Sequence, residues 1–174
     1  MKYSREDQMY PHVSGWLEAF LKDRHRHAEI RVIDASRKSL SRLITDYGFQ
    51  DRVPAEWVSW DIQVDVVGFV LQKQQMLMAF VECKVGFLTL RDLSQLLGYS
   101  RVALPRYSFL VSPEGPSDFL TSLLRTYNRS DVLRYNFPIG QTPWSIAVGR
   151  WIGQAKNLDW SSVISDDVMF LGQL

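Results

Sequence analysis

Three charged residues interrupt two segments of the sequence that are otherwise strongly apolar. Asp65 stands among the valines of segment 61–71, and Glu82 and Lys84 flank a cysteine in segment 76–85. Charged side chains are rarely buried unless they are paired or bind a metal ion. Their presence in segments that look like interior strands therefore suggests a site.

A hairpin formed by these two segments would bring the two carboxylates together. The connection 72–75 is short and polar, which predicts an antiparallel pair. With the turn centred between Lys73 and Gln74, paired residue numbers sum to 147, so Asp65 lies directly opposite Glu82. Directly opposed Cβ atoms are about 4.5–5.5 Å apart, and two carboxylates at that spacing repel each other. A cation between them would remove the repulsion.

The chemistry open to this group is metal-assisted hydrolysis. Two carboxylates suit Mg²⁺ or Mn²⁺, with water molecules completing the coordination. Lys84 lies two residues from Glu82 and shares its strand face, where it would orient or deprotonate a water or stabilise a developing anion. Cys83 points to the opposite face, and we expect it to be an inert apolar residue. The alternative is a structural ion-pair cluster on a solvated face, against which the apolar neighbours argue.

The elements that position these residues follow from hydrophobic spacing. Helical periodicity, strand alternation and turn residues occur in mixed order, which predicts an α/β (α+β) domain with a mixed β-sheet flanked by helices. Leu90, Leu93, Leu96 and Leu97 are expected to form the buried face of the helix after Lys84. The predicted helices cover 13–26, 40–47, 89–99 and about 117–127, and the predicted strands cover 28–34, 61–71, 76–85, 107–111 and 144–148.

Composition limits the class of protein. The chain has 174 residues, 46% hydrophobic residues and a formal charge of +1, which fits a single domain and excludes a strongly basic coat. We expect a core at about 10–113 and a C-terminal extension at 114–174. One cysteine, a charged N-terminus and the lack of a long apolar run predict a cytoplasmic protein without a membrane span.

The pattern of Asp65 followed by Glu82-Cys83-Lys84 on the next strand and then a helix resembles the PD-(D/E)xK nuclease superfamily. The segment Gln95-Leu96-Leu97-Gly98-Tyr99 is similar to the Q-x-x-x-Y motif of its RecB-like branch. The resemblance covers roughly 13–111 and implies a restriction-endonuclease-like fold. One departure from the motif is that valine, not proline, precedes Asp65.

The resemblance implies a role for each matching residue. Asp65, Glu82 and the backbone carbonyl of Cys83 would hold Mg²⁺ or Mn²⁺, and Lys84 would serve the attacking water. Glu18, on the opening helix, matches a supporting or second-metal carboxylate. The implied activity is hydrolysis of DNA phosphodiester bonds, and the residues implied as catalytic are Asp65, Glu82, Lys84, Glu18 and Gln95.

The supporting residues also have plainer interpretations. Glu18 is spaced for an exposed i,i+4 ion pair with Lys22, with Glu6 and Glu29 as less favoured substitutes. Gln95 and Tyr99 fall opposite the leucines of their helix, which fits either solvent or a substrate groove.

Basic and aromatic residues supply candidate contacts to DNA. The cluster at 22–31 and the arginines around the helix after Lys84 would contact phosphates. A homodimer would also fit, because cutting two strands often uses two copies related by twofold symmetry. Two alternatives stay open: an inactive nucleic-acid- or protein-binding module on the same fold, and an unrelated domain that assembles through its tryptophans. The candidate nucleic-acid contacts are Arg24, Arg26, Arg91, Tyr99 and Arg101.

Overall fold

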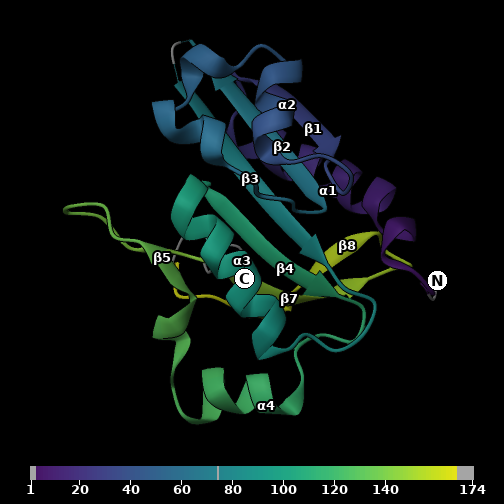
Figure 1. The fold of residues 1–174 in the computed structure, drawn as a ribbon. Helices are drawn as coiled ribbons and strands as arrows, with labels where there is room; N and C mark the ends of the chain where they lie inside the picture. The colour runs from purple at the N-terminus through teal and green to yellow at the C-terminus, as the bar shows by residue number, and fades with distance from the viewer. Residues whose placement is uncertain (1–2, 74, 168–174) are drawn as a thin grey trace.

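The computed structural model describes residues 3–73 and 75–167. Its centre is a six-stranded mixed sheet with strand order β1-β2-β3-β4-β7-β8 (Figure 1). A separate two-stranded sheet pairs β5 with β6. The strands are β1 Glu29–Asp34, β2 Val66–Gln72, β3 Gln75–Cys83, β4 Tyr107–Ser112, β5 Arg134–Asn136, β6 Trp144–Ser145, β7 Ala147–Ile152 and β8 Asn157–Ile164.

Helices connect these strands and confirm the predicted mixed α/β class. A capping box starts α3: the Thr89 side chain accepts a hydrogen bond from the backbone N–H of Asp92, and the Asp92 side chain accepts one from the backbone N–H of Thr89. The helices are α1 Tyr10–Arg24, α2 Leu40–Asp46, α3 Leu90–Ala103 and α4 Asp118–Thr121. Short helical turns are η1 Glu6–Gln8, η2 Gln50–Arg52, η3 Ala55–Ser59, η4 Ser122–Thr126 and η5 Ser130–Leu133.

The register of the central hairpin is the one predicted from the sequence. Val66 pairs with Val81 and Gln72 pairs with Gln75, so paired residue numbers sum to 147. Strands β1, β2 and β3 are mutually antiparallel, whereas β3, β4 and β7 run parallel. The hairpin thus makes β2 and β3 neighbours in the sheet. Helix α3 then connects β3 to its parallel neighbour β4.

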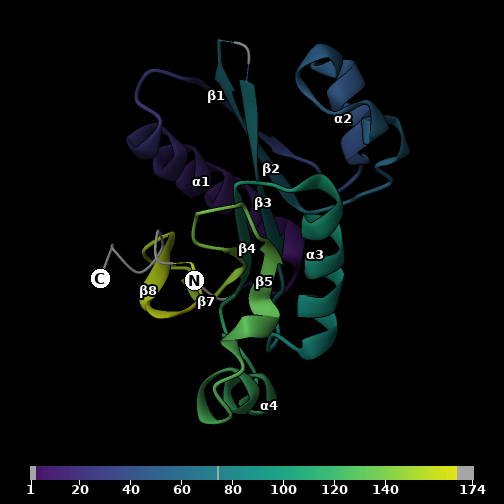
Figure 2. The ribbon, with the colours of Figure 1, turned by 90° about the vertical axis from the view of Figure 1, so that its left-hand side faces the viewer.

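Helices cover both faces of the sheet. Helix α1 packs on one face, and α2 and α3 lie on the other (Figure 2). Gly68 of β2 permits the close approach of α1, because a Cβ atom at this position would lie 2.6 Å from Cδ1 of Leu21. The close packing of α1 brings its first turn to the end of the sheet where β2 begins.

Several element boundaries differ from the prediction. Strand β2 begins at Val66, so Asp65 lies just before the strand. Leu90 was predicted to be buried but is 54% exposed, because it is the first residue of α3 and the buried stripe begins one turn later at Leu93. The predicted helix at about 117–127 is a four-residue α-helix followed by a π-helical turn, Ser122–Thr126.

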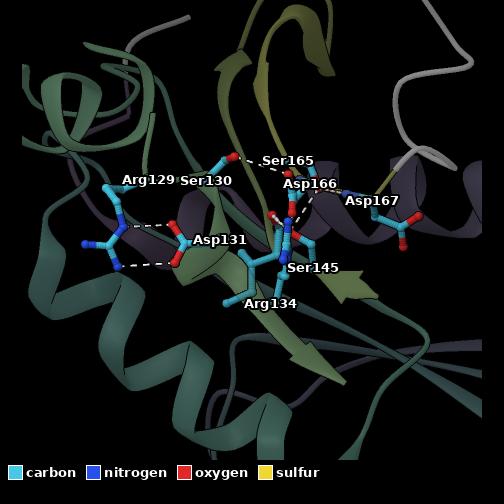
Figure 3. Close-up of polar contacts among 9 residues, drawn as sticks. Arg129, Ser130, Asp131, Arg134, Ser145, Ser165, Asp166 and Asp167 are labelled. Atoms are coloured by element: carbon cyan, nitrogen blue, oxygen red, sulfur yellow. Dashed lines mark hydrogen bonds and ion pairs between the residues drawn. The ribbon is translucent and has the colours of Figure 1, made fainter. Parts of the chain in front are cut away.

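The C-terminal third of the chain is an integral part of the sheet. Strands β7 and β8 fall in the expected extension 114–174, yet they complete the six-stranded sheet. Asp166 ties the chain after β8 to the small sheet: it accepts hydrogen bonds from Ser130 and Arg134, and its N–H donates to Ser145 (Figure 3). Within the described part of the chain, no helix is long and apolar enough to cross a membrane.

Candidate active site

Asp65 is held at the junction of three elements. Its carbonyl oxygen accepts a hydrogen bond from the N–H of Ala35, just after β1, at 2.8 Å. Asp65 is 8% exposed, and each of its carboxylate oxygens accepts a hydrogen bond. The Tyr10 hydroxyl donates to Oδ1 at 2.6 Å, and the backbone N–H of Cys83 donates to Oδ2 at 2.7 Å. The Asp65 carboxylate therefore has a defined position at the end of the hairpin.

Glu82 and Lys84 lie at the same end of the hairpin. Glu82 is 5% exposed on β3, and Lys84 follows the last residue of that strand. Lys84 Nζ donates to Oε1 of Glu82 at 2.8 Å. The backbone N–H of Lys84 donates to Val111 of β4, which anchors the start of the loop. The structure thus brings the buried carboxylates of Asp65 and Glu82 and one ammonium group together, as the sequence predicts.

The electrostatics of the two carboxylates show that they need positive charge. Burial, together with the nearby charge of Asp65, raises the pKa of Glu82 to about 7. Burial likewise raises the pKa of Asp65, although its hydrogen bonds from Tyr10 and Cys83 oppose the shift. Ionising both carboxylates is costly in this environment unless a cation compensates them.

Lys84 supplies part of that positive charge. Burial by itself would lower the pKa of Lys84, but its hydrogen bond to Glu82 and the neighbouring carboxylates outweigh burial and raise the pKa above its ordinary value. Lys84 is therefore an ammonium ion at neutral pH. Of the roles considered from the sequence, orienting a water or stabilising an anion suits this charge state better than removing a proton.

A different glutamate from the predicted one stands beside Lys84. Oε1 of Glu6, on η1, lies 3.7 Å from Lys84 Nζ, and burial raises the pKa of Glu6. Glu18 instead forms an i,i+4 ion pair with Lys22 on α1. The helix directs its first turn, rather than its middle, toward the end of the hairpin. The sequence offered Glu6 only as a less favoured substitute for Glu18, although it is an acidic residue just before the opening helix.

The predicted DNA-contacting residues lie on two parts of the surface. On α3, Arg91 and Arg101 are exposed, and Tyr99 is half-buried against the core. Gln95, which the resemblance implies as catalytic, is exposed on the same helix, and its role stays a prediction. Arg24 ends α1, about 20 Å along the helix axis from Tyr10. Their contacts with a substrate stay predictions, as do those of the exposed Arg26, which lies 3.8 Å from Asp23.

Cys83 is a structural residue here. Its side chain is fully buried in the cluster beneath α1, on the face opposite Glu82. Burial and the two neighbouring carboxylates raise the pKa of its thiol well above the ordinary value, so it stays protonated. Its backbone N–H, rather than its sulfur, serves the site by holding Asp65. The role of its carbonyl as a metal ligand stays a prediction.

The donor set suits one class of metal ion. Among residues 3–73 and 75–167, no three His, Cys, Asp or Glu side chains are grouped so that they could hold an ion. A structural zinc site needs such a group, whereas Mg²⁺ is commonly held by one or two carboxylates together with waters and substrate phosphates. Asp65 and Glu82 therefore fit Mg²⁺ or Mn²⁺ bound jointly with a substrate.

The raised pKa of Glu82 predicts how stability depends on pH without metal. The folded protein binds this proton more tightly than the unfolded chain does, so the free energy of unfolding should fall as pH rises from 4.5 to about 7. The expected fall is at most about 3 kcal/mol. Urea unfolding in EDTA across this range, with Glu82→Gln as the comparison, measures it. A profile for Glu82→Gln as steep as that of the wild type would contradict the assignment.

Comparison of the chain with protein-family models, curated proteins and solved structures finds no match in any of the three.

Proposed function

We propose that this protein is a Mg²⁺-dependent nuclease that hydrolyses phosphodiester bonds in DNA. The observation that carries the proposal is the pair of buried carboxylates, Asp65 and Glu82, with the Lys84 ammonium 2.8 Å from Glu82 Oε1. Buried charges of this kind are expensive for a fold, so they favour a chemical role over a structural one. The resemblance of the same residues to the PD-(D/E)xK motif supports the same reaction.

Each residue has a defined part in the proposed hydrolysis. Mg²⁺, when bound, would polarise the phosphate and lower the pKa of a water molecule. Asp65 and Glu82 would hold the ion, and Tyr10 and the Cys83 amide would keep Asp65 in place through their hydrogen bonds. Lys84 would orient the attacking water and offset negative charge on the phosphate.

Metal binding is the direct test of the proposal. We expect calorimetric titration with Mn²⁺ and Mg²⁺ to show binding to the wild type and its loss in Asp65→Ala. Asp61→Ala is the matched control, because Asp61 is an exposed aspartate in the same segment. Circular dichroism verifies that each variant is folded. Equal binding by Asp65→Ala and the wild type would reject the site.

A substrate screen then separates an enzyme from a binding module. Single-stranded, duplex and branched DNA and RNA would be incubated with Mg²⁺ or with EDTA. Cleavage that requires Mg²⁺ and is lost in Asp65→Ala supports the nuclease. Nucleic-acid binding without metal binding or cleavage would instead support the inactive module.

Glu6 and Glu18 can be distinguished by a matched pair of substitutions. We expect Glu6→Gln to lower the cleavage rate by about tenfold, the effect typical of a group that supports a metal site without ligating it. Glu18→Gln should leave the rate within about twofold, because Glu18 pairs with Lys22 on the helix surface. The measurement is the single-turnover rate at saturating Mg²⁺. The opposite ranking would restore the role predicted for Glu18.

A further inference from the structure

A groove with a volume of about 620 Å³ runs along the outer side of α1. The helix supplies one side of it, from Pro11 to Arg24, and the other side is formed by the β7–β8 turn and by Trp160 of β8. The small residues Gly15 and Ala19 lie on its helix side, and a Cβ atom at Gly15 would meet nothing within 4 Å. Asp65, Glu82 and Lys84 do not line this groove, so it is distinct from the candidate active site.

Aromatic rings form one surface of the groove. Trp160 stacks on Phe20 with ring centroids 5.9 Å apart and an angle of 20° between the rings. The ring centroids of Trp16 and Trp160 are 6.3 Å apart, and Trp16 packs edge-on against the buried Trp151. Trp16 and Trp160 are both half-buried, so each is held by the core while part of it faces the groove. Such a rigid surface is suited to stacking with flat apolar groups.

Cationic groups border this aromatic surface. The Arg24 guanidinium carbon lies 3.9 Å from the centroid of Phe20, and Lys156 lines the groove from the β7–β8 turn. Asp23 also lines the groove, but Arg26 lies 3.8 Å from its carboxylate and offsets its charge. The groove therefore combines ring surfaces with unbalanced positive charge, and its complement is a ligand with flat rings and regularly spaced anions.

The backbone at Lys156 makes this residue a convenient position to test. Its φ is +50°, in the left-handed region where glycine or asparagine is favoured and other side chains are strained. Glycine adopts this conformation without strain, so Lys156→Gly removes the ammonium group while keeping the turn.

We propose that this groove binds a single-stranded segment of nucleic acid, with bases against Trp16 and Trp160 and phosphates near Arg24 and Lys156. The proposal rests on the proposed nuclease function in one respect, that the bound strand belongs to the substrate. The groove begins at the end of α1 where Tyr10 contacts Asp65, and it extends along the helix as far as Arg24. That length is about 20 Å, or about six nucleotides at the rise of about 3.4 Å that stacked bases have in a duplex strand, which falls among the site sizes of about 4–16 nucleotides typical of single-strand binding folds.

The length of the groove leads to a specific binding experiment. Fluorescence anisotropy would be measured with labelled oligo(dT) of 3, 6, 9 and 12 nucleotides, in EDTA so that no cleavage occurs. We expect affinity to rise steeply up to about six nucleotides and then to level off. An affinity that rises evenly with length across the whole series, as for non-specific attraction, would overturn the assignment of the groove.

Lys156→Gly is the most informative variant, because it should weaken binding without weakening the fold. Removing one phosphate contact should lower affinity by about fivefold and reduce the slope of log K against log salt by about 0.7. The melting temperature should not fall, because glycine relieves the strained φ. Lys73→Gly is the matched control: Lys73 also has a positive φ in a hairpin turn, but it lines a different hollow. Equal losses of oligonucleotide affinity in Lys156→Gly and Lys73→Gly would reject the assignment of the groove as a nucleic-acid site.

The experiment separates this inference from the proposed function. Length-dependent binding that needs Lys156, in a protein that cleaves no substrate, would support the groove and reject the nuclease. Mg²⁺-dependent cleavage with no effect of Lys156→Gly would support the nuclease and reject the groove. Self-association on ultracentrifugation, without oligonucleotide binding, would overturn the inference in favour of a second copy of the chain.

Discussion

Lys84→Ala is expected to lower the rate of Mg²⁺-dependent cleavage by about 10²- to 10³-fold, the usual effect of removing one electrostatic contact to a transition state. The substitution removes the ammonium group that lies 2.8 Å from Glu82 and 3.7 Å from Glu6. Negative charge that develops on the phosphate would then lose the ammonium group that lies beside these carboxylates. The measurement is the single-turnover rate on the best substrate from the screen.

The affinity of the Lys84→Ala variant for Mg²⁺ should not fall with its cleavage rate. Lys84 donates to Oε1 of Glu82 and competes electrostatically with a cation for that carboxylate. Mg²⁺ should therefore bind Lys84→Ala at least as tightly as it binds the wild type. This combination, slower cleavage with undiminished metal binding, distinguishes a lysine that acts on the phosphate or water from one that only holds the site together.

Lys22→Ala is the matched control for this prediction. Lys22 forms an ion pair with a glutamate as Lys84 does, but on the exposed surface of α1. Its removal should leave the cleavage rate within about twofold, because exposed pairs contribute little. A rate for Lys84→Ala equal to that of Lys22→Ala would refute the role assigned to Lys84.

Asp167→Ala is expected to lower the free energy of unfolding by about 4 kcal/mol, which is the effect of removing one partner from a buried ion pair. The carboxylate of Asp167 is 2% exposed and lies 3.1 Å from Nη1 of Arg106, whose side chain is 16% exposed. The Arg106 guanidinium also lies over the rings of Tyr107 and Trp144. Without Asp167, this charge would stay buried against aromatic rings and lose its ion-pair partner there.

Two comparisons make this prediction specific. Asp131→Ala removes the partner of Arg129 in an exposed ion pair and should cost less than about 1 kcal/mol (Figure 3). Replacing both Arg106 and Asp167 by leucine should recover much of the loss, because no unpaired charge is then buried. Urea unfolding at pH 7 measures all three variants. If Asp131→Ala and Asp167→Ala lower the free energy of unfolding by similar amounts, burial does not decide how much an ion pair contributes to stability here.

Local patterns in the sequence were sufficient to predict the central part of the candidate site. The β2–β3 register follows from a short polar turn and from apolar residues on both sides of it, so the pairing of Val66 with Val81 needs no information from distant segments. The start of α3 follows similarly from Thr89 and Asp92. Both are short-range features, because each depends on residues that are close in the chain or joined by one tight turn.

Contacts between distant segments were not predictable in this way. The sequence favoured Glu18 as the supporting acid, whereas the structure places Glu6 beside Lys84. Both residues belong to the opening helical region, and the choice between them depends on how α1 crosses the sheet. That crossing is set by packing contacts such as Leu21 against Gly68, which no local pattern encodes. The Tyr10 hydrogen bond to Asp65 joins residues 55 positions apart and depends on the same packing.

The sequence by itself thus determined the α/β class, the central hairpin and the proximity of Asp65, Glu82 and Lys84. Only the tertiary structure decided which carboxylate approaches Lys84, where β8 joins the sheet and how α1 and β8 enclose a groove. The physical reason is the range of the interactions. Turn chemistry and strand alternation act between near neighbours, whereas the position of a helix on a sheet depends on the shapes of many side chains at once.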